Sequence, residues 1–211
     1  MTDLFSALRP ERECLQEGVY LLPNFFDGQE VLHIVQQLLD QAPFRHMKTP
    51  GGRRMAVALT NCGTVGWISD TKGYRYSPTD PLTNTPWPPM PAALLSLARS
   101  AAEKCGYEDF RPDSCLINRY DPGSALSPHQ DRNENDFSQP IVSLSIGRSA
   151  MFQLYGQERG GKAVNIRLND GDILVFGGPA RLNFHGVRRL LPDAPAHMSD
   201  GRINLTLRQA L

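Results

Sequence analysis

Short segments of alternating hydrophobic and polar residues dominate the second half of the chain. Residues 202–208 alternate almost perfectly, with Ile203, Leu205 and Leu207 on the apolar face, and residues 141–146 follow the same pattern. A period of two is typical of strands whose two faces meet different surroundings. Further short apolar segments occupy residues 115–120, 150–155, 164–168 and 172–176. Many short strands at close spacing predict a double-sheet barrel of the jelly-roll type.

The turn Asn169-Asp170-Gly171 separates two of these segments. Asn-Gly and Asp-Gly sequences favour tight hairpin turns because they tolerate positive φ. We therefore expect residues 164–168 and 172–176 to pair as a hairpin.

The first half of the chain has a different pattern. Apolar residues at helical spacing predict a helix over residues 28–41, with Asp27 as its N-cap. A second helix is expected from Pro91 to Cys105, closed by Gly106. A strand is expected at residues 19–22, and residues 1–18 are expected to form a loosely held arm. The rest of the region before Pro112 is interpreted as loops, so the predicted fold is mainly β with flanking helices.

The polar face of residues 202–208 carries Arg202, Asn204, Thr206 and Arg208. A strand side that faces solvent would explain this pattern. The alternative is the polar wall of a pocket, in which two guanidinium groups pair with the two carboxylates of a diacid, since Arg binds carboxylate bidentately.

Composition narrows the class of protein. The chain has 211 residues and a formal net charge of zero, which fits one domain without a global attraction to nucleic acid. Its four cysteines form no C-x-x-C pair, which argues against a structural zinc site and for a reducing compartment. The N-terminus lacks the pattern of a signal peptide, and no long apolar run predicts a membrane span. We expect a soluble, cytoplasmic protein without a membrane partner, and a monomer by default.

The stretch His129-Gln130-Asp131 suggests a metal site. Side chains two apart in an extended segment point to the same face, so His129 and Asp131 can converge on one ion. Together with His185, they would make the two-histidine, one-carboxylate triad of non-haem Fe(II) oxygenases. The H-x-D pair alone is common, and taken by itself it favours a polar surface loop.

Two stretches upstream suggest contact with nucleic acid. Residues 45–54 place basic side chains around a Pro-Gly-Gly turn, which favours either a solvated loop or a hairpin that contacts phosphates. Trp67, Tyr74 and Tyr76 lie among glycines, as stacking platforms for bases do, although aromatic residues also fill local cores.

Taken together, these motifs resemble one known family. Asn118-Arg119-Tyr120, His129-Gln130-Asp131, Phe184-His185-Gly186 and the stretch 202–209 occur in the order and spacing of the AlkB family of Fe(II)- and 2-oxoglutarate-dependent dioxygenases. The segments around residues 49–52, 60–63, 66–67 and 73–78 resemble that family's lid over the substrate. The resemblance extends from about Leu4 to Ala210.

The resemblance implies a role for particular residues. His129, Asp131 and His185 match the iron ligands. Arg202, Asn118, Tyr120 and Asn204 match residues that bind 2-oxoglutarate, and Arg208 matches an arginine between this co-substrate and the aspartate ligand. The implied substrate-binding residues are Trp67, Tyr74, Met55, Thr49, Arg53, Arg132 and Asn133. The chain departs from the pattern at Asn133, where an acidic residue is usual, and this concerns base preference more than activity. It also carries Arg132 in place of a lysine and Phe176 in place of a tryptophan.

The implied function is repair of N-alkylated bases such as 1-methyladenine and 3-methylcytosine. The family's chemistry uses Fe(II), 2-oxoglutarate and O2, proceeds through an iron(IV)-oxo intermediate, and releases formaldehyde, succinate and carbon dioxide. The implied partner is alkylated DNA, preferably single-stranded, with double-stranded DNA and RNA as alternatives. The implied layout is a single domain, residues 1–211. It consists of an N-terminal arm and helix (1–42), a nucleotide-recognition lid (43–90), a supporting helix (91–111) and a jelly-roll catalytic core (112–211).

Two other functions are considered. One is the same oxygenase chemistry on RNA, a protein or a small molecule. The other is a cupin-like metal-binding protein without oxygen chemistry, which would leave Arg202 and Arg208 without a ligand. A non-catalytic nucleic-acid binder fits less well, because the triad is intact.

Overall fold

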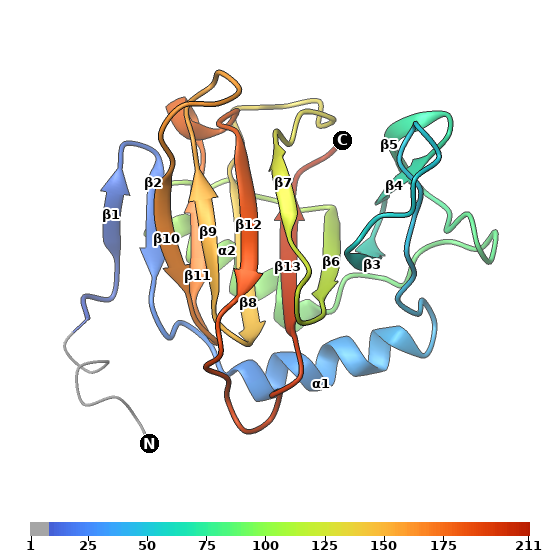
Figure 1. Cartoon of the computed structure of the whole chain (residues 1–211), viewed down its shortest axis with the longest axis horizontal. Coiled ribbons are helices and arrows are strands. Elements are labelled where there is room, and N and C mark those ends of the chain that lie inside the picture. Colours follow the sequence, from blue (N-terminus) through green and yellow to red (C-terminus); the bar gives the residue numbers. More distant parts are fainter. Residues whose placement is uncertain (1–8) are drawn as a thin grey trace.

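Two antiparallel sheets stacked face to face form the core of this computed structural model, which describes residues 9–211 (Figure 1). The large sheet has the strand order β1-β2-β11-β8-β13-β6-β3, and the small sheet has the order β10-β9-β12-β7. The large-sheet strands are β1 (Glu13–Gln16), β2 (Val19–Leu22), β3 (Ala58–Gly63), β6 (Ser114–Tyr120), β8 (Ile141–Gly147), β11 (Ile173–Phe176) and β13 (Arg202–Arg208). The small-sheet strands are β7 (Leu126–His129), β9 (Ala150–Leu154), β10 (Val164–Leu168) and β12 (His185–Leu190). This arrangement is a jelly roll, as the sequence predicts.

The inner faces of the two sheets pack against each other. Phe176 on β11 contacts Phe152 on β9, with ring centroids 6.1 Å apart. The same cluster continues through buried residues of both sheets, among them Tyr120, Leu154 and Val187. One end of the space between the sheets is thereby filled with apolar side chains, so that polar groups are confined to the rest of it.

Two helices cover the outer face of the large sheet. Helix α1 (Gly28–Leu39) and helix α2 (Ala92–Lys104) share one buried cluster with outward side chains of β8, β11 and β13. In Figure 1, α2 lies behind this sheet. Burial of apolar surface on this side explains why Ile203, Leu205 and Leu207 form the apolar face of their strand.

Both predicted helices are confirmed, with slightly shorter bounds. The Asp27 carboxylate accepts hydrogen bonds from the backbone N–H of Gln29, at 2.8 Å, and of Glu30, at 3.2 Å. It therefore satisfies two of the N–H groups that a helix start leaves unpaired. Gly106 ends the second helix in the left-handed conformation, with a φ of +88°.

The predicted hairpin of residues 164–168 and 172–176 is wrong. β10 pairs with β9 in the small sheet, whereas β11 pairs with β2 and β8 in the large sheet. The Asn169-Asp170-Gly171 turn exists, with Gly171 at a φ of +80°, but it carries the chain from one sheet to the other. Asp170 accepts a hydrogen bond from the backbone N–H of Gly147, which ties the crossing to β8.

The region before Pro112 also contains more strands than expected. β1 lies in the segment predicted to be an arm, whose first eight residues are outside the described residues. β3 lies in the predicted lid segment but pairs with β6 at the edge of the large sheet. β4 (Gly66–Asp70) and β5 (Gly73–Ser77) form a separate two-stranded hairpin beside that edge (Figure 1). The glycines that favoured loops lie at the ends of these short strands.

A 3₁₀ turn, η2 (Gly178–Ala180), follows β11 and leads toward β12. Within residues 9–211, no helix is long and apolar enough to cross a membrane.

Candidate active site

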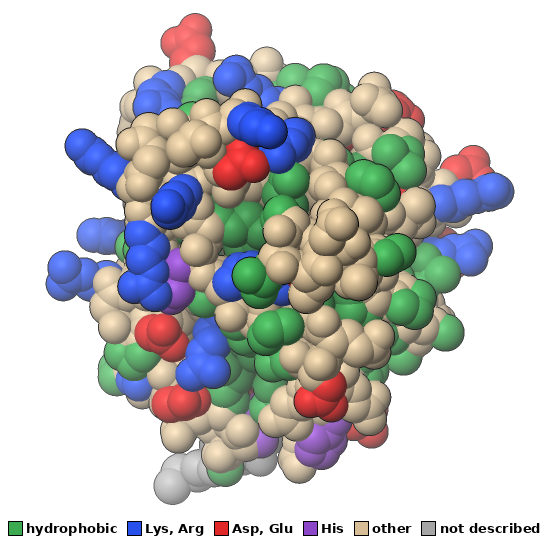
Figure 2. All heavy atoms as spheres, turned by 90° about the vertical axis from the view of Figure 1, so that its right-hand side faces the viewer, with side chains coloured by type: hydrophobic (Ala, Val, Ile, Leu, Met, Phe, Trp, Pro, Cys, Tyr) green, Lys and Arg blue, Asp and Glu red, His purple; other side chains and the backbone are tan. Residues whose placement is uncertain are grey.

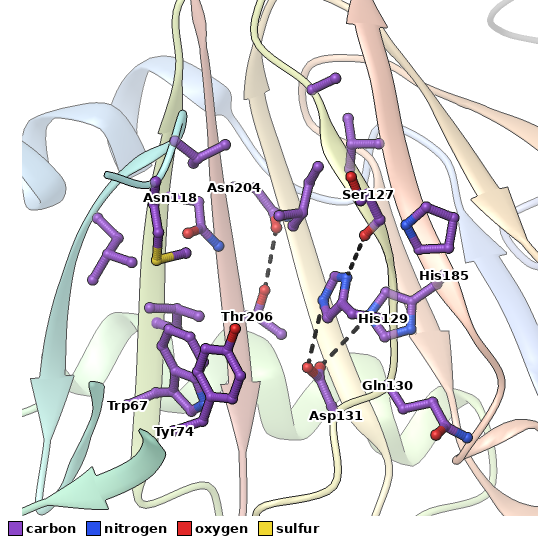
Figure 3. Close-up of a pocket in the computed structure, with 18 of the residues that line it drawn as sticks. Trp67, Tyr74, Asn118, Ser127, His129, Gln130, Asp131, His185, Asn204 and Thr206 are labelled. Carbon is purple, nitrogen blue, oxygen red and sulfur yellow. Dashed lines mark hydrogen bonds and ion pairs between the residues drawn. The ribbon is translucent and has the colours of Figure 1, made fainter. Parts of the chain in front are cut away.

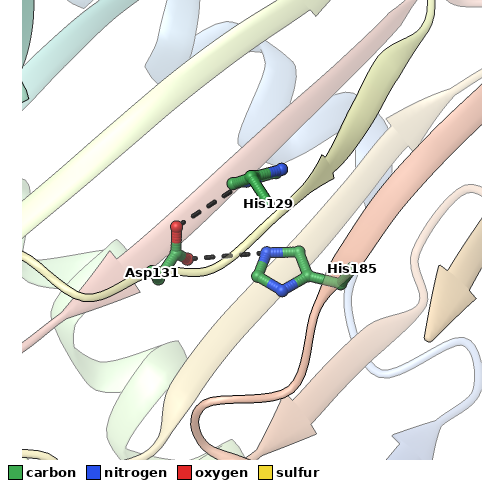
Figure 4. A group of neighbouring side chains, drawn as sticks. All are labelled: His129, Asp131 and His185. Carbon is green, nitrogen blue, oxygen red and sulfur yellow. Dashed lines mark ion pairs between the residues drawn. The ribbon is translucent and has the colours of Figure 1, made fainter. Parts of the chain in front are cut away.

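Three side chains predicted to bind a metal lie together beside β7 and β12 of the small sheet (Figure 4). His129 ends β7, His185 begins β12, and these two residues are paired across the strands. Asp131 follows β7, and its carboxylate faces both imidazole rings (Figure 4). His129 Nε2 is 3.7 Å from Asp131 Oδ1, and His185 Nε2 is 3.7 Å from Asp131 Oδ2. The pairing of β7 with β12 thus brings together residues that are more than fifty positions apart.

The histidine rings are oriented by backbone carbonyls. His129 Nδ1 is 3.0 Å from the Ser127 carbonyl oxygen, and His185 Nδ1 is 3.1 Å from the Asn183 carbonyl oxygen. With the proton on Nδ1, each Nε2 presents its lone pair toward the centre of the cluster. Burial lowers the pKa of His185 to about 4, and the neighbouring His129 acts in the same direction. His185 is therefore neutral near pH 7, the form that binds a metal.

Asp131 is held as a carboxylate by an arginine. Arg208 donates from Nε, at 3.0 Å, and from Nη2, at 2.7 Å, to Asp131 Oδ2. Burial alone would raise the pKa of Asp131, but the positive charge of Arg208 and the two imidazoles outweigh it and keep the pKa well below its usual range. A carboxylate with two neutral imidazoles is a donor set that suits Fe(II) and leaves coordination positions open.

The polar face of β13 is buried between the sheets. Arg202, Asn204, Thr206 and Arg208 are each less than 8% exposed. The interpretation of this face as a solvent-exposed strand side is therefore wrong, because the small sheet covers it. Its neighbours in the large sheet are Asn118 and Tyr120 on β6 and Ser143 and Ser145 on β8.

Both arginines of β13 have N–H groups that lack a partner among residues 9–211. Arg202 donates from Nη2 to Ser145 Oγ at 2.9 Å, and its guanidinium lies over the Tyr120 ring, 5.5 Å from the centroid. Its Nε and Nη1, and Nη1 of Arg208, are buried and unpaired. A buried unpaired donor is costly. An anionic ligand would satisfy these groups, since Arg pairs bidentately with carboxylate, so the unpaired donors fit a diacid such as 2-oxoglutarate.

Asn204 has hydrogen-bond partners within the large sheet. It lines the cavity, but its Nδ2 donates to Ser143 Oγ and to the Leu144 carbonyl, both at 2.8 Å, and its Oδ1 accepts from Thr206 Oγ1 at 3.1 Å. Both N–H groups of the amide thus join β13 to β8, whereas Oδ1 can accept a second hydrogen bond. Asn118, the cross-strand neighbour of Asn204 on β6, also lines the cavity (Figure 3), and its amide has no hydrogen-bond partner among residues 9–211.

A cavity of about 850 Å³ is lined by Asn204, Thr206 and Arg208 of this polar face and reaches the exposed side chain of Arg53. Trp67 and Tyr74 lie across the cavity from His129 and His185 (Figure 3). Their rings are stacked, with centroids 5.5 Å apart and an angle of 15° between the planes. The other residues predicted to bind substrate also line this cavity: Thr49, Arg53, Met55, Arg132 and Asn133. The structure therefore places the metal cluster and all the residues predicted to bind substrate around one cavity.

Asn133 has a definite contact in this cavity. Its Oδ1 accepts a hydrogen bond from Trp67 Nε1 at 3.2 Å. Because indole nitrogen is only a donor, this bond fixes which end of the amide faces Trp67. Asn133 therefore helps to hold the aromatic ring at the cavity mouth.

The basic segment 45–54 is only partly available to a ligand. Arg45 forms an ion pair with buried Asp80 and lies over the Trp87 ring. His46 Nδ1 is 2.8 Å from the Met55 carbonyl oxygen. Lys48, Arg53 and Arg54 are exposed. Figure 2 shows the molecular face on this side, with Lys and Arg side chains gathered beside a hollow that contains hydrophobic side chains.

Comparison with known proteins decides between the functions considered above. A model of the 2OG-Fe(II) oxygenase superfamily matches residues 18–208. The chain belongs to this superfamily. The oxygenase is 46% identical over 212 residues to the alpha-ketoglutarate-dependent dioxygenase AlkB of Escherichia coli K12, across 100% of this chain and 98% of the relative. It is 42% identical over 197 residues to the AlkB homolog of Caulobacter vibrioides, across 92% and 88% of the two chains.

The oxygenase therefore belongs to the AlkB family, as its motifs predict. The solved structure of OsALKBH1 has the same fold, with a TM-score of 0.82 at 28% identity over 94% of this chain and 99% of that chain. The chain is an Fe(II)- and 2-oxoglutarate-dependent dioxygenase that uses O2. The cupin-like alternative without oxygen chemistry is wrong.

Two residues that sequence reasoning did not single out for a role, Glu134 and Arg181, lie next to the metal cluster of the oxygenase. Glu134 and Arg181 are buried and form an ion pair at 3.1 Å. Tyr76 donates from its hydroxyl to Glu134 at 2.5 Å. Glu134 comes three residues after Asp131 in a polar run, where it resembles a surface residue. Its burial results from loop 131–139 folding back toward Arg181, which the local sequence does not reveal.

Proposed function

We propose that this dioxygenase repairs DNA by removing alkyl groups from N-alkylated bases such as 1-methyladenine and 3-methylcytosine. One arrangement supports this most strongly. A stacked aromatic pair, the two-histidine, one-carboxylate cluster and Arg208 on the buried polar face of β13 line one cavity. This cavity has room for a single base on one side and a diacid on the other.

On the metal side, His129, Asp131 and His185 would hold Fe(II). Arg202 and Arg208 would pair with the two ends of 2-oxoglutarate, with Asn118 and Tyr120 beside it. Asn204 is assigned an indirect part, because its amide is engaged with β8. Burial raises the pKa of Tyr120 to about 12, so its hydroxyl stays protonated and can donate to a carboxylate.

On the substrate side, Trp67 and Tyr74 would stack on a base that has been flipped out of its strand. Cationic alkylated bases pair poorly and are easier to flip, and an indole ring attracts a cation through its π face. Met55 and Asn133 would contact the base. Thr49, Arg53 and Arg132 would contact the phosphate backbone, since basic side chains at the rim attract phosphate.

Bound iron, with 2-oxoglutarate and O2, would supply the oxidising power to hydroxylate the N-alkyl carbon. The protein's residues do the rest. They orient the base so that its alkyl group points at the cluster, keep water out by stacking, and hold Asp131 ionised through Arg208. The hydroxymethyl group on nitrogen then leaves as formaldehyde, which restores the base.

The test is a repair assay followed by mass spectrometry. The protein is incubated with Fe(II), 2-oxoglutarate and a single-stranded DNA oligonucleotide that carries one 1-methyladenine or 3-methylcytosine. We expect the oligonucleotide to lose one methylene unit in mass (CH2), with no loss in a His129→Ala control. Turnover of 2-oxoglutarate without loss of the methyl group would contradict the proposed substrate.

We also propose that the enzyme acts as a monomer with residues 1–211 as one domain, and that it works in the cytoplasm.

The same assay distinguishes the nucleic acids that could serve as substrate. We propose that single-stranded DNA is preferred. Duplex DNA and an RNA oligonucleotide with the same lesion serve as competing substrates. Faster repair of the RNA would overturn the DNA assignment and leave the chemistry in place.

A further inference from the structure

Glu134 is a buried carboxylate that the proposed chemistry does not use. It is 6% exposed and lies three residues after the metal-binding aspartate. Its Oε1 accepts a hydrogen bond from the Tyr76 hydroxyl at 2.5 Å, and its Oε2 accepts from Arg181 Nη2 at 3.1 Å. Oε1 is also 3.7 Å from Arg208 Nε, on the arginine that pairs with Asp131. Glu134 thus contacts three different parts of the fold.

Arg181 fixes the loop that carries both acidic residues. Its guanidinium donates from Nη1 to the Asp131 carbonyl and from Nε to the Gln139 carbonyl, both at 2.9 Å. With the bond to Glu134, one buried side chain holds loop 131–139 at three points. Four charges alternate along this network, in the order Arg181, Glu134, Arg208 and Asp131. Each buried charge is therefore compensated by its neighbours, which is the condition for keeping it ionised.

Tyr76 connects this network to the aromatic hairpin. It lies on β5, directly opposite Trp67 on β4 and two residues from Tyr74. Opposite residues and residues two apart share a face of a hairpin, so Trp67, Tyr74 and Tyr76 lie on one side. Burial raises the pKa of Tyr76 far above its usual value, so its hydroxyl keeps the proton that it donates. A two-stranded hairpin alone is marginally stable, so its anchors decide where it sits.

A second anchor holds the other strand of the hairpin. The Asn61 side chain accepts from the Trp67 backbone N–H and donates to its carbonyl, both at 3.0 Å, which ties β4 to β3. The Tyr76 hydroxyl provides the corresponding link from β5 to loop 131–139. This link ends on the Glu134 carboxylate, which also lies near Arg208.

We propose that Tyr76 and Glu134 are positioning residues that couple the seating of the aromatic hairpin to the arginine that holds Asp131. Glu134 shares the charge of Arg208, so the place of this guanidinium beside Asp131 depends on where Glu134 lies. The position of Glu134 depends in turn on Tyr76. When Tyr76 is bonded to Glu134, the aromatic residues of the hairpin and the Asp131 carboxylate are held in fixed positions relative to each other. The coupling to demethylation rests on the proposed function, but the mechanical link does not.

The decisive variant is Tyr76→Phe, which removes one hydroxyl and keeps the ring. We expect backbone hydrogen exchange to become faster at residues 73–77 in the protein without metal. We also expect the molar ratio of formaldehyde to succinate to fall, with kcat/KM for demethylation down about tenfold, the usual size for a lost bond to a charged group. Tyr107→Phe removes the same atom beside the helices and should match the wild type in exchange and product ratio.

Glu134→Gln tests the other end of the link. Because it leaves Arg181 without a charged partner, it is expected to lower thermal stability as well as the product ratio. The double variant Tyr76→Phe/Glu134→Gln should show less than the product of the two single effects on kcat/KM, since both changes break one link. Independent effects that multiply would overturn the proposal.

The Tyr76→Phe variant keeps the test valid if Glu134→Gln does not fold. Wild-type exchange at residues 73–77 together with a wild-type product ratio would overturn the coupling. If the wild-type enzyme leaves alkylated DNA unchanged, the proposed function fails. The exchange measurement on Tyr76→Phe and Tyr107→Phe would still decide whether the link holds the hairpin.

Discussion

The arginine wall is the polar face of β13, which carries Arg202 and Arg208. It lies across one cavity, lined by Arg208, from the aromatic hairpin, yet the wall and the hairpin are held in different ways. Arg202 and Arg208 are under 5% exposed and lie in the middle of a seven-stranded sheet. Trp67 and Tyr74 lie on a two-stranded hairpin, with Tyr74 47% exposed. The wall is fixed by two neighbouring strands, whereas the hairpin depends on a few side-chain anchors.

This contrast suits the two ligands. A co-substrate of constant shape is best met by groups that are already in place, because little ordering is then lost on binding. A base that must enter from a strand needs a platform that can adjust. We therefore expect changes in the wall to act on iron and 2-oxoglutarate, and changes in the hairpin or its rim to act on nucleic acid.

Asp131→Ala should have the largest effect. It removes one metal ligand and leaves Arg208 with Glu134 alone, at 3.7 Å, so iron retention should fall more than about 100-fold, beyond the loss typical of residues around a metal site. Metal content after desalting measures this directly. Asp121→Ala, in an exposed pair with Arg119, is the matched control and should keep its iron. Iron retention by Asp131→Ala would contradict the assignment of this ligand.

Arg202→Lys should come next. Lysine keeps the charge but loses the planar fork whose Nε and Nη1 await a partner, so KM for 2-oxoglutarate should rise about tenfold or more. KM for the oligonucleotide should stay within about twofold of the wild type. Arg119→Lys, on the same sheet but half-exposed, should change neither value. An equal rise in both KM values for Arg202→Lys would mean that the two sides of the cavity are not separate.

The sequence predicted the wall better than the hairpin for a physical reason. The alternation of residues 202–208 and the spacing of His129 and Asp131 are local properties of extended chain, and the structure keeps them. The hairpin predicted at Asn169-Asp170-Gly171 is wrong because a turn sequence specifies a bend and not the sheet that the next strand joins. Burial of Glu134 and Arg181 depends on contacts between residues 47 positions apart, which no local pattern contains.

Trp67→Ala tests the hairpin side. Loss of one base-stacking platform costs about 1–3 kcal/mol, so binding of the alkylated oligonucleotide should weaken about tenfold to 100-fold. Binding of 2-oxoglutarate should be unaffected, as measured by titration with each ligand separately. Trp67→Phe keeps a ring but loses the hydrogen bond to Asn133, so its affinity for the oligonucleotide should lie between those of the wild type and Trp67→Ala. Unchanged DNA affinity in Trp67→Ala would exclude Trp67 as a stacking platform.

Variants of two arginines in the basic segment should distinguish contact with the DNA phosphate backbone from support of the protein fold. Arg53 is exposed at the cavity rim, so Arg53→Gln should weaken DNA binding about equally for all sequences and reduce the slope of log Kd against log salt by about 1. Arg45→Gln should leave the slope unchanged and lower Tm, because it removes the ion-pair partner of buried Asp80. The reverse pattern would mean that Arg45 is the residue that contacts phosphate.

Asp70→Asn should have the smallest effect. Asp70 pairs with Arg75 within the hairpin at 2.8 Å, and hydrogen bonds from Arg75 and from the Lys72 backbone N–H lower the pKa of Asp70 from 3.8 to about 2. The contribution of this pair to stability is therefore present above pH 3.8 and lost as the pH falls toward 2. Both side chains are about 40% exposed, so water and salt screen the pair and no resolvable change in Tm at pH 7 is expected. A clear loss of DNA affinity in Asp70→Asn would show that the exposed turn, and not only the Tyr76 and Asn61 anchors, sets the position of the aromatic platform.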